Sequence, residues 1–163
     1  MPATLHNRPQ EIVPAIEAML DETDGQYERT LLAFGDCGTG GGLDRLCKAR
    51  GLERLPGAHC YAFFAGLPEF DAMMEEELGT FFLTDFLARQ FDAMVMRPLG
   101  LDRNPELRDL YFGHYRRLVF LSQTQDPDLI VRAEAAAGRL GLAFEHRPTG
   151  LSPFARELAR IAA

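Results

Sequence analysis

The sequence has no long hydrophobic run and no cluster of basic residues. No apolar stretch approaches the roughly 20 residues of a membrane-spanning helix, and segment 1–10 lacks the apolar core of a secretory signal peptide. Arg116–Arg117 is the one adjacent basic pair, and the net charge is −7. Binding to a phosphate backbone needs a cationic face. We therefore expect a protein that binds neither membranes nor nucleic acid.

Cysteine is also scarce. The 3 cysteines are an odd number and too few for a disulfide framework in a chain of 163 residues. Together with the absence of a signal-peptide core, this predicts a cytoplasmic protein whose thiols are reduced. Lysine occurs once, at Lys48, and arginine replaces it throughout without clustering. We interpret that bias as a property of genomic base composition rather than of function.

Apolar runs and helical patterns alternate along the chain. Continuous apolar runs predict buried strands, and apolar residues three and four positions apart predict amphipathic helices. We therefore predict a single α/β domain over residues 1–163, with a mostly parallel open sheet of about four to five strands and helices on both faces. The expected strands are 30–34, 57–64, 118–121 and 142–146, with 80–83 as a brief strand or loop. The expected helices are 9–20, 43–50, 67–77, 84–95, 105–115, 126–140 and one that begins near 153.

A glycine-rich loop, 35–42, follows the first expected strand and contains Cys37. Ligands of open parallel sheets bind outside the carboxyl ends of the strands, and Cys37 falls at such an end. Loop amides and a following helix N-terminus lower the pKa of a thiol, whereas the neighbouring carboxylate of Asp36 raises it. Cys37 is therefore a candidate metal ligand or nucleophile. The alternative is a small residue tolerated in a tight turn.

The same loop offers a second kind of site. Backbone amides in a glycine-rich loop can approach a phosphate or carboxylate closely. The loop lacks both the Lys-Ser/Thr pair of a P-loop and the Gly-x-Gly-x-x-Gly spacing of dinucleotide sites. An anion- or nucleotide-binding module that uses loop residues 38–42 nevertheless remains an alternative. Its candidate binding residues are Gly38, Thr39, Gly40 and Gly41.

His59 and Cys60 form the second candidate cluster. Histidine and cysteine are both ligands of transition metals. If the segment 57–64 is a strand, adjacent side chains point to opposite faces, so only one of the two can join Cys37. The alternative is that Cys60 is a core residue of this apolar segment.

Two further groups of residues have a functional and a structural interpretation. Glu76 or Glu77, at the end of the helix expected over 67–77, could supply an oxygen ligand or a general base. The alternative is a solvated helix end, which is the usual role of a run of charges. Cys47 lies four residues after Leu43 on the inward stripe of a helix, where cysteine behaves as a small hydrophobic residue.

Several separated segments, spread over nearly the whole chain, are shared with one family. They are 5–9, 35–41, 57–61, 79–85 and 100–103. In these motifs the chain resembles domain of unknown function 1638. The resemblance implies roles for a cysteine in a Cys-Gly loop, a later cysteine, and a glutamate before a Pro-Gly-Thr turn. These correspond to Cys37, Cys60, and Glu76 or Glu77, although Leu78 stands where the family tends to have proline.

The resemblance carries two more expectations. Relatives occur in corrinoid-using microbes, so a link to corrinoid or methyl-transfer metabolism follows by association. Relatives also tend to carry a strand–helix unit before the segment 5–7. Either this unit is missing here or the start was assigned downstream. A missing unit would leave an edge strand exposed and would favour a homodimer.

The leading hypothesis is a metal-binding α/β protein in which Cys37 and Cys60 hold zinc, another transition metal or a metallocofactor. Glu76 or Glu77 is the third ligand in this hypothesis. Besides the anion-binding module, one alternative is a thiol-nucleophile enzyme without metal. Such an enzyme needs a base near Cys37, and His59 is the candidate. Each version has a small molecule or a metal as its partner.

Overall fold

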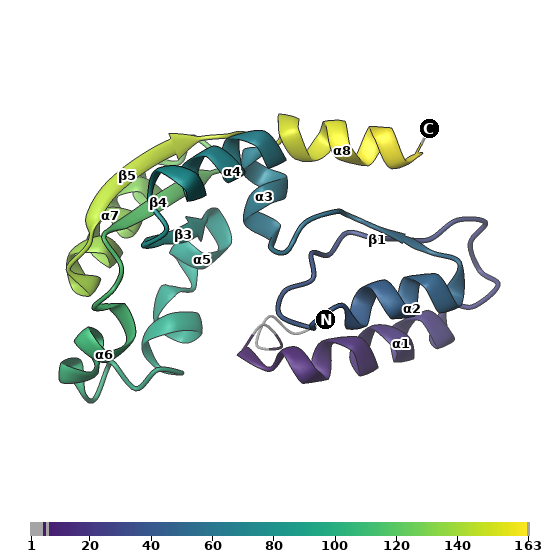
Figure 1. The fold of residues 1–163 in the computed structure, drawn as a ribbon, viewed down its shortest axis with the longest axis horizontal. Coiled ribbons are helices and arrows are strands. Elements are labelled where there is room, and N and C mark those ends of the chain that lie inside the picture. The colour runs from purple at the N-terminus through teal and green to yellow at the C-terminus, as the bar shows by residue number, and fades with distance from the viewer. Residues whose placement is uncertain (1–4, 6, 163) are drawn as a thin grey trace.

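The computed structural model describes residue 5 and residues 7–162. The chain forms two parallel sheets rather than one (Figure 1). β1 (Leu31–Leu32) pairs with β2 (Glu53–Arg54), while β3 (Thr80–Thr84), β4 (Arg117–Ser122) and β5 (Ala143–Pro148) pair in that order. The predicted α/β class and the parallel direction of the strands are confirmed. The prediction of one larger sheet is wrong.

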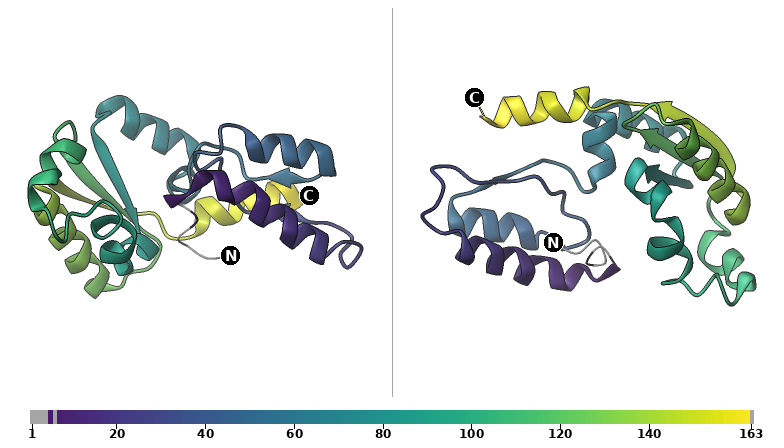
Figure 2. Two further views of the ribbon diagram at one scale, coloured as in Figure 1. Left: turned by 90° about the horizontal axis from the view of Figure 1, so that it is seen from below. Right: turned by 180° about the vertical axis from the view of Figure 1, so that it is seen from behind.

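The β1–β2 sheet is covered on both faces. Leu31 and Leu32 point to opposite faces because side chains alternate along a strand. Leu32 packs against the apolar stripes of α1 (Ile12–Glu22) and α2 (Gly42–Arg50), which lie side by side (Figure 1 and Figure 2). Leu31 belongs to the cluster on the other face, which is built from α3 (Cys60–Ala65) and α8 (Ser152–Ala162). A short 3-10 turn, η2 (Pro9–Glu11), leads into α1.

The three-stranded sheet is covered in the same manner. Along β4, Leu118 and Phe120 face one helical layer, and Val119 and Leu121 face the other. All four side chains are at most 1% exposed, as expected for a central strand of a parallel sheet. One layer contains α4 (Leu67–Glu76) together with α3. The other contains α5 (Asp85–Arg89), the π-helical turn η3 (Asp92–Met96), η4 (Pro105–Leu107), α6 (Arg108–Phe112) and α7 (Pro127–Leu140).

The apolar segment 57–64 is not the predicted strand. It contains a loop followed by α3, and the strand of this region is β2, a two-residue element without an apolar run. A short apolar run fits a buried helix as well as a buried strand, and here Ala62 and Phe63 are buried by helical packing. The helices expected over 9–20, 84–95 and 105–115 each divide into two elements. Every other expected helix and strand has a counterpart.

Several predicted helix boundaries are confirmed. Gly51 and Gly141 end α2 and α7 in the left-handed conformation, with φ of 65° and 72°. Thr84 rather than Asp85 caps α5, because its hydroxyl accepts a hydrogen bond from the amide of Leu87. Within the described residues, none of the helices has the length and apolar character of a membrane span. A single domain over 1–163 and a homodimer both stay predictions.

Candidate functional site

Cys37 lies where the loop after β1 is joined to the loop after β2. The amide of Asp36 donates to the carbonyl of Gly57 over 3.2 Å, and the amide of Cys37 donates to the carbonyl of Ala58 over 2.8 Å. Gly35 permits this approach, since a Cβ there would lie 3.1 Å from the backbone of His59. Cys37 itself has φ of +48°, a left-handed conformation that is uncommon for a residue with a side chain. The two segments therefore hold Cys37 in one unusual orientation.

The glycine loop already binds an anion of its own. The carboxylate of Asp36 accepts hydrogen bonds from the hydroxyl of Thr39 and from the amides of Gly40 and Gly41, over 2.6, 3.1 and 2.9 Å. The hydrogen bond from Thr39 is the largest of the effects that hold the pKa of Asp36 below its ordinary value. Two of the amides proposed to cradle a phosphate are thus occupied. The anion-binding alternative would need Asp36 to be displaced.

His59 and Cys60 both line the pocket that Cys37 also lines. The prediction that only one of them can do so rested on a strand, and the segment is not a strand. His59 is extended and immediately precedes α3, and Cys60 is the first residue of that helix. At a helix start, successive side chains turn by about 100° rather than 180°. Tertiary structure therefore places Cys37 and Cys60 on the wall of one pocket, and their joint binding of a metal stays a prediction.

Both thiols are protonated at neutral pH. Burial, with a smaller contribution from the charge of Cys37, raises the pKa of Cys60 to about 12. Burial also raises the pKa of Cys37, although hydrogen bonds from the amides of Cys60 and Gly35 partly oppose this. A nucleophilic cysteine needs a lowered pKa. These environments count against a thiol nucleophile that acts without a metal.

The pocket has a volume of about 480 Å³. It lies beyond the carboxyl ends of β1, β2 and β3, where open parallel sheets bind ligands. Cys37 and Gly38 come from the loop after β1, His59 and Cys60 from the segment after β2, and Thr84 from the end of β3. Figure 1 shows α3 between the β1–β2 unit and the three-stranded sheet. The remaining wall residues are Asn7, Tyr61, Phe64, Phe81, Phe86, Leu87, Met94, Val95, Pro98, Leu99 and Phe112.

Neither glutamate reaches this pocket. Glu76 accepts a hydrogen bond from Arg117 over 2.9 Å, and Glu77 accepts one from the amide of Gly79 over 2.7 Å. Both lie before β3, whereas the pocket lies at its other end, so the length of the strand, roughly 15 Å, separates them. The described residues contain no cluster of three or more His, Cys, Asp or Glu side chains that could hold a metal ion. The proposed third ligand is therefore not supplied by Glu76 or Glu77.

Cys47 lies outside the pocket and is 6% exposed, as a structural cysteine should be. The sequence reasoning missed most of the pocket wall. Asn7 and residues of η3 are part of the wall because segments distant in sequence pack together. One feature of the sequence could have indicated this wall: Thr84 lies at the end of an expected strand, and ligands bind at the carboxyl ends of strands.

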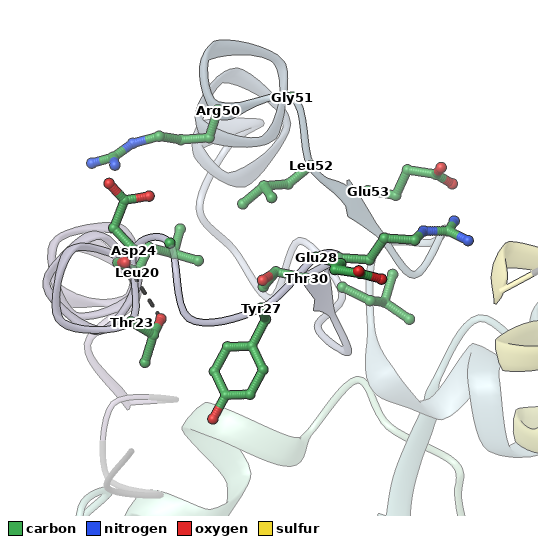
Figure 3. A pocket seen from close by; sticks show the side chains of 13 residues that line it. Leu20, Thr23, Asp24, Tyr27, Glu28, Thr30, Arg50, Gly51, Leu52 and Glu53 are labelled. Carbon is green, nitrogen blue, oxygen red and sulfur yellow. Dashed lines mark hydrogen bonds between the residues drawn. The ribbon is translucent and has the colours of Figure 1, made fainter.

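A second, larger pocket of about 630 Å³ lies at the opposite end of the β1–β2 sheet (Figure 3). Its wall carries charges of both signs, from Asp24, Glu28, Glu53, Arg29 and Arg50. It opens beside the amino ends of both strands, which is not where open parallel sheets bind ligands. The cysteine pocket is the stronger candidate for a functional site, because it lies at the carboxyl ends of the strands and contains reactive side chains.

Comparison with known families gives one match. The model described as "Protein of unknown function (DUF1638)" matches residues 1–158. The chain belongs to the DUF1638 family. No curated protein and no solved structure matches it. The family resemblance of the sequence is thereby confirmed, and membership in DUF1638 assigns no activity, so the function rests on the chemistry of the site.

Proposed function

We propose that this DUF1638 protein binds a soft metal ion, or the metal of a small cofactor, through the thiolates of Cys37 and Cys60. The observation that carries the proposal is that two cysteines from separate segments line one pocket. A metal would have to displace the proton that each partly buried thiol keeps, so binding should release protons and tighten as the pH rises. The left-handed backbone at Cys37 supports the proposal, since strained residues persist where the surrounding structure holds them for function.

The ligand number restricts which metals fit. Zinc takes four ligands, and a structural zinc site supplies all four from the protein. With two thiolates alone, coordination positions stay open toward the pocket for solvent or a bound molecule. Soft thiolate ligands favour ions such as copper(I) and zinc. The proposal is therefore an open site of the kind that binds or activates a small molecule, rather than a structural zinc site.

The corrinoid association gains no support from the pocket. A corrinoid carries a rim of amide groups and is held by many polar contacts. The pocket wall is mostly apolar. Among the described residues, its side chains with a hydrogen-bonding oxygen or nitrogen are those of Asn7, His59, Tyr61 and Thr84. The metal proposal therefore stands on the two cysteines and not on that association.

Metal binding by matched cysteine variants tests the proposal. Reduced, metal-free protein is titrated anaerobically with cobalt(II), whose thiolate complexes absorb by charge transfer, and separately with copper(I). We expect one ion per chain in the wild type. Cys37→Ala and Cys60→Ala should each weaken binding by about 100-fold or more, because each removes half of the protein ligands. Cys47→Ala is the matched control, since Cys47 lies outside the pocket.

Two results would overturn the proposal. The first is that the reduced wild type binds neither ion more tightly than the double variant Cys37→Ala/Cys60→Ala. The second is that Cys47→Ala abolishes binding as completely as the two site variants. Circular dichroism of each variant establishes that the helices and strands are retained.

A further inference from the structure

Among the residues that the structure describes, the wall of the cysteine pocket contains no aspartate, glutamate, lysine or arginine. This is unusual in a chain that is 25% charged and carries a net charge of −7. The volume of about 480 Å³ lies in the range of small-molecule sites, which is roughly 300–1,000 Å³. The wall therefore has the size of a ligand site and is mostly apolar, with a few uncharged polar side chains and a histidine.

Such a wall selects against charged ligands. An ion that enters an apolar pocket loses its hydration, and without a countercharge this loss is not compensated. Binding of an apolar molecule is favourable, because the apolar surfaces of both the molecule and the pocket are removed from water. We infer that the natural ligand of this pocket is an uncharged molecule with an apolar body and a small polar end. The inference rests on the proposed function only in placing that ligand beside the metal-binding cysteines.

The two sides of the pocket differ in a way that orients such a ligand. The loop side contributes Cys37, His59 and Cys60, together with Asn7. The helical side contributes apolar side chains from the segment that runs from α5 through α6, namely Phe86, Leu87, Met94, Val95, Pro98, Leu99 and Phe112. The polar end of the ligand therefore faces the cysteines, and its apolar body lies against the helical side.

The helical side is built for a ligand rather than for tight packing alone. η3 is a π-helical turn, and such turns recur at functional sites. Met94 and Val95 of this turn line the pocket, and a methionine side chain adapts to the shape of its neighbour. Phe86 lines the pocket while 46% exposed, so a ligand can cover its ring. These features are independent of the two thiols.

A matched set of three probes tests the inference. Benzyl alcohol, benzoate and benzylammonium share one ring and differ in charge. Metal-free protein with ¹³C-methyl methionine is titrated with each probe and followed by NMR. We expect a saturable shift of the Met94 methyl signal with benzyl alcohol, and binding of either ion that is weaker by about 100-fold or more. Met19, which is 50% exposed on α1 and outside the pocket, is the internal control.

Two substitutions locate the binding. Phe86→Asp places a charge at the pocket wall and should weaken benzyl alcohol binding about tenfold or more. Leu110→Asp, at a residue that is 72% exposed and outside the pocket wall, should leave it unchanged. The inference is overturned if Met94 responds to none of the probes, or if an ion binds as well as benzyl alcohol. Because the protein is metal-free throughout, failure of metal binding leaves these outcomes unaffected.

Discussion

At the scale of single residues, Cys60 combines a reactive group with a partly buried position. Burial in the cluster of Leu55, Phe63 and α8 disfavours its thiolate, and this raises the pKa of the thiol from its ordinary value of 9.0 to about 12. The folded state therefore holds the proton more tightly than the unfolded state does. Linkage then makes the stability of the protein depend on pH in the alkaline range.

The sign of this dependence is fixed by the raised pKa. The contribution of Cys60 is fully present below pH 9, where the unfolded thiol is protonated, and is lost as the pH rises through 9 to 12. We predict that the free energy of unfolding falls by up to about 1.4 kcal/mol per pH unit in this range through Cys60. Cys60→Ala should remove that part of the slope in denaturant titrations. Cys37 and Tyr61, whose pKa values burial also raises, leave a residual slope of the same sign.

Leu158→Ala is the control for this prediction. Leu158 packs in the same cluster as Cys60 but does not titrate. Its truncation should lower stability at every pH and leave the alkaline slope unchanged. An alkaline slope that is the same in wild type and Cys60→Ala would contradict the prediction.

At the scale of elements, α7 shows how far local rules define a helix. Asp126 accepts a hydrogen bond from the amide of Asp128 at the first turn, and Gly141 ends the helix. Leu129, Ala133, Ala136, Ala137 and Leu140 form its buried stripe. Gly138 is the exception, because glycine in a helix interior loses more backbone freedom than alanine on folding.

Gly138→Ala should therefore stabilise the protein. A Cβ at this position would meet nothing within 4 Å, so the substitution adds no clash. We predict a gain of about 0.5–1 kcal/mol in the free energy of unfolding, measured by urea denaturation. Gly113→Ala is the contrasting substitution: its Cβ would clash with the carbonyl oxygen of Asp109, so it should destabilise the protein. Equal effects at the two glycines would refute this reasoning.

At the scale of the whole molecule, the two sheets differ in how well they are buried. β4 is the central strand of three and has helices on both faces. β1 and β2 each have two residues and pair only with one another among the described residues. Small two-stranded pairings are marginal by themselves and depend on the helices packed against them. The cysteine pocket lies where these unequally stable parts meet.

Hydrogen exchange should reveal this difference. We predict that the amides of β4 exchange slowest, at the rate of global unfolding, and that those of β1 exchange at least about 100-fold faster through local opening. Mass spectrometry of labelled peptides over 31–32 and 117–122 measures both. Binding of a metal at Cys37 and Cys60 should slow exchange in the loops that follow β1 and β2. Uniform protection of the two sheets would contradict the prediction.

The sequence by itself determined those features whose cause is local. Apolar runs predicted β4 and β5, an apolar stripe predicted α7, and two glycines predicted helix ends. Each of these features depends on residues within a few positions of one another. The position of Cys37 after a strand also followed from local pattern. Family membership was equally readable from separated motifs.

Tertiary structure alone decided what the cysteines meet. Whether the apolar segment 57–64 becomes a strand or a helix depends on the partners that bury it, and those partners, including α8, lie far away in sequence. The same packing divided the strands into two sheets and kept Glu76 and Glu77 away from the pocket. Burial also set the pKa of Cys60, which no sequence pattern encodes. Local periodicity specifies which face of an element is apolar, but only the folded chain specifies what covers that face.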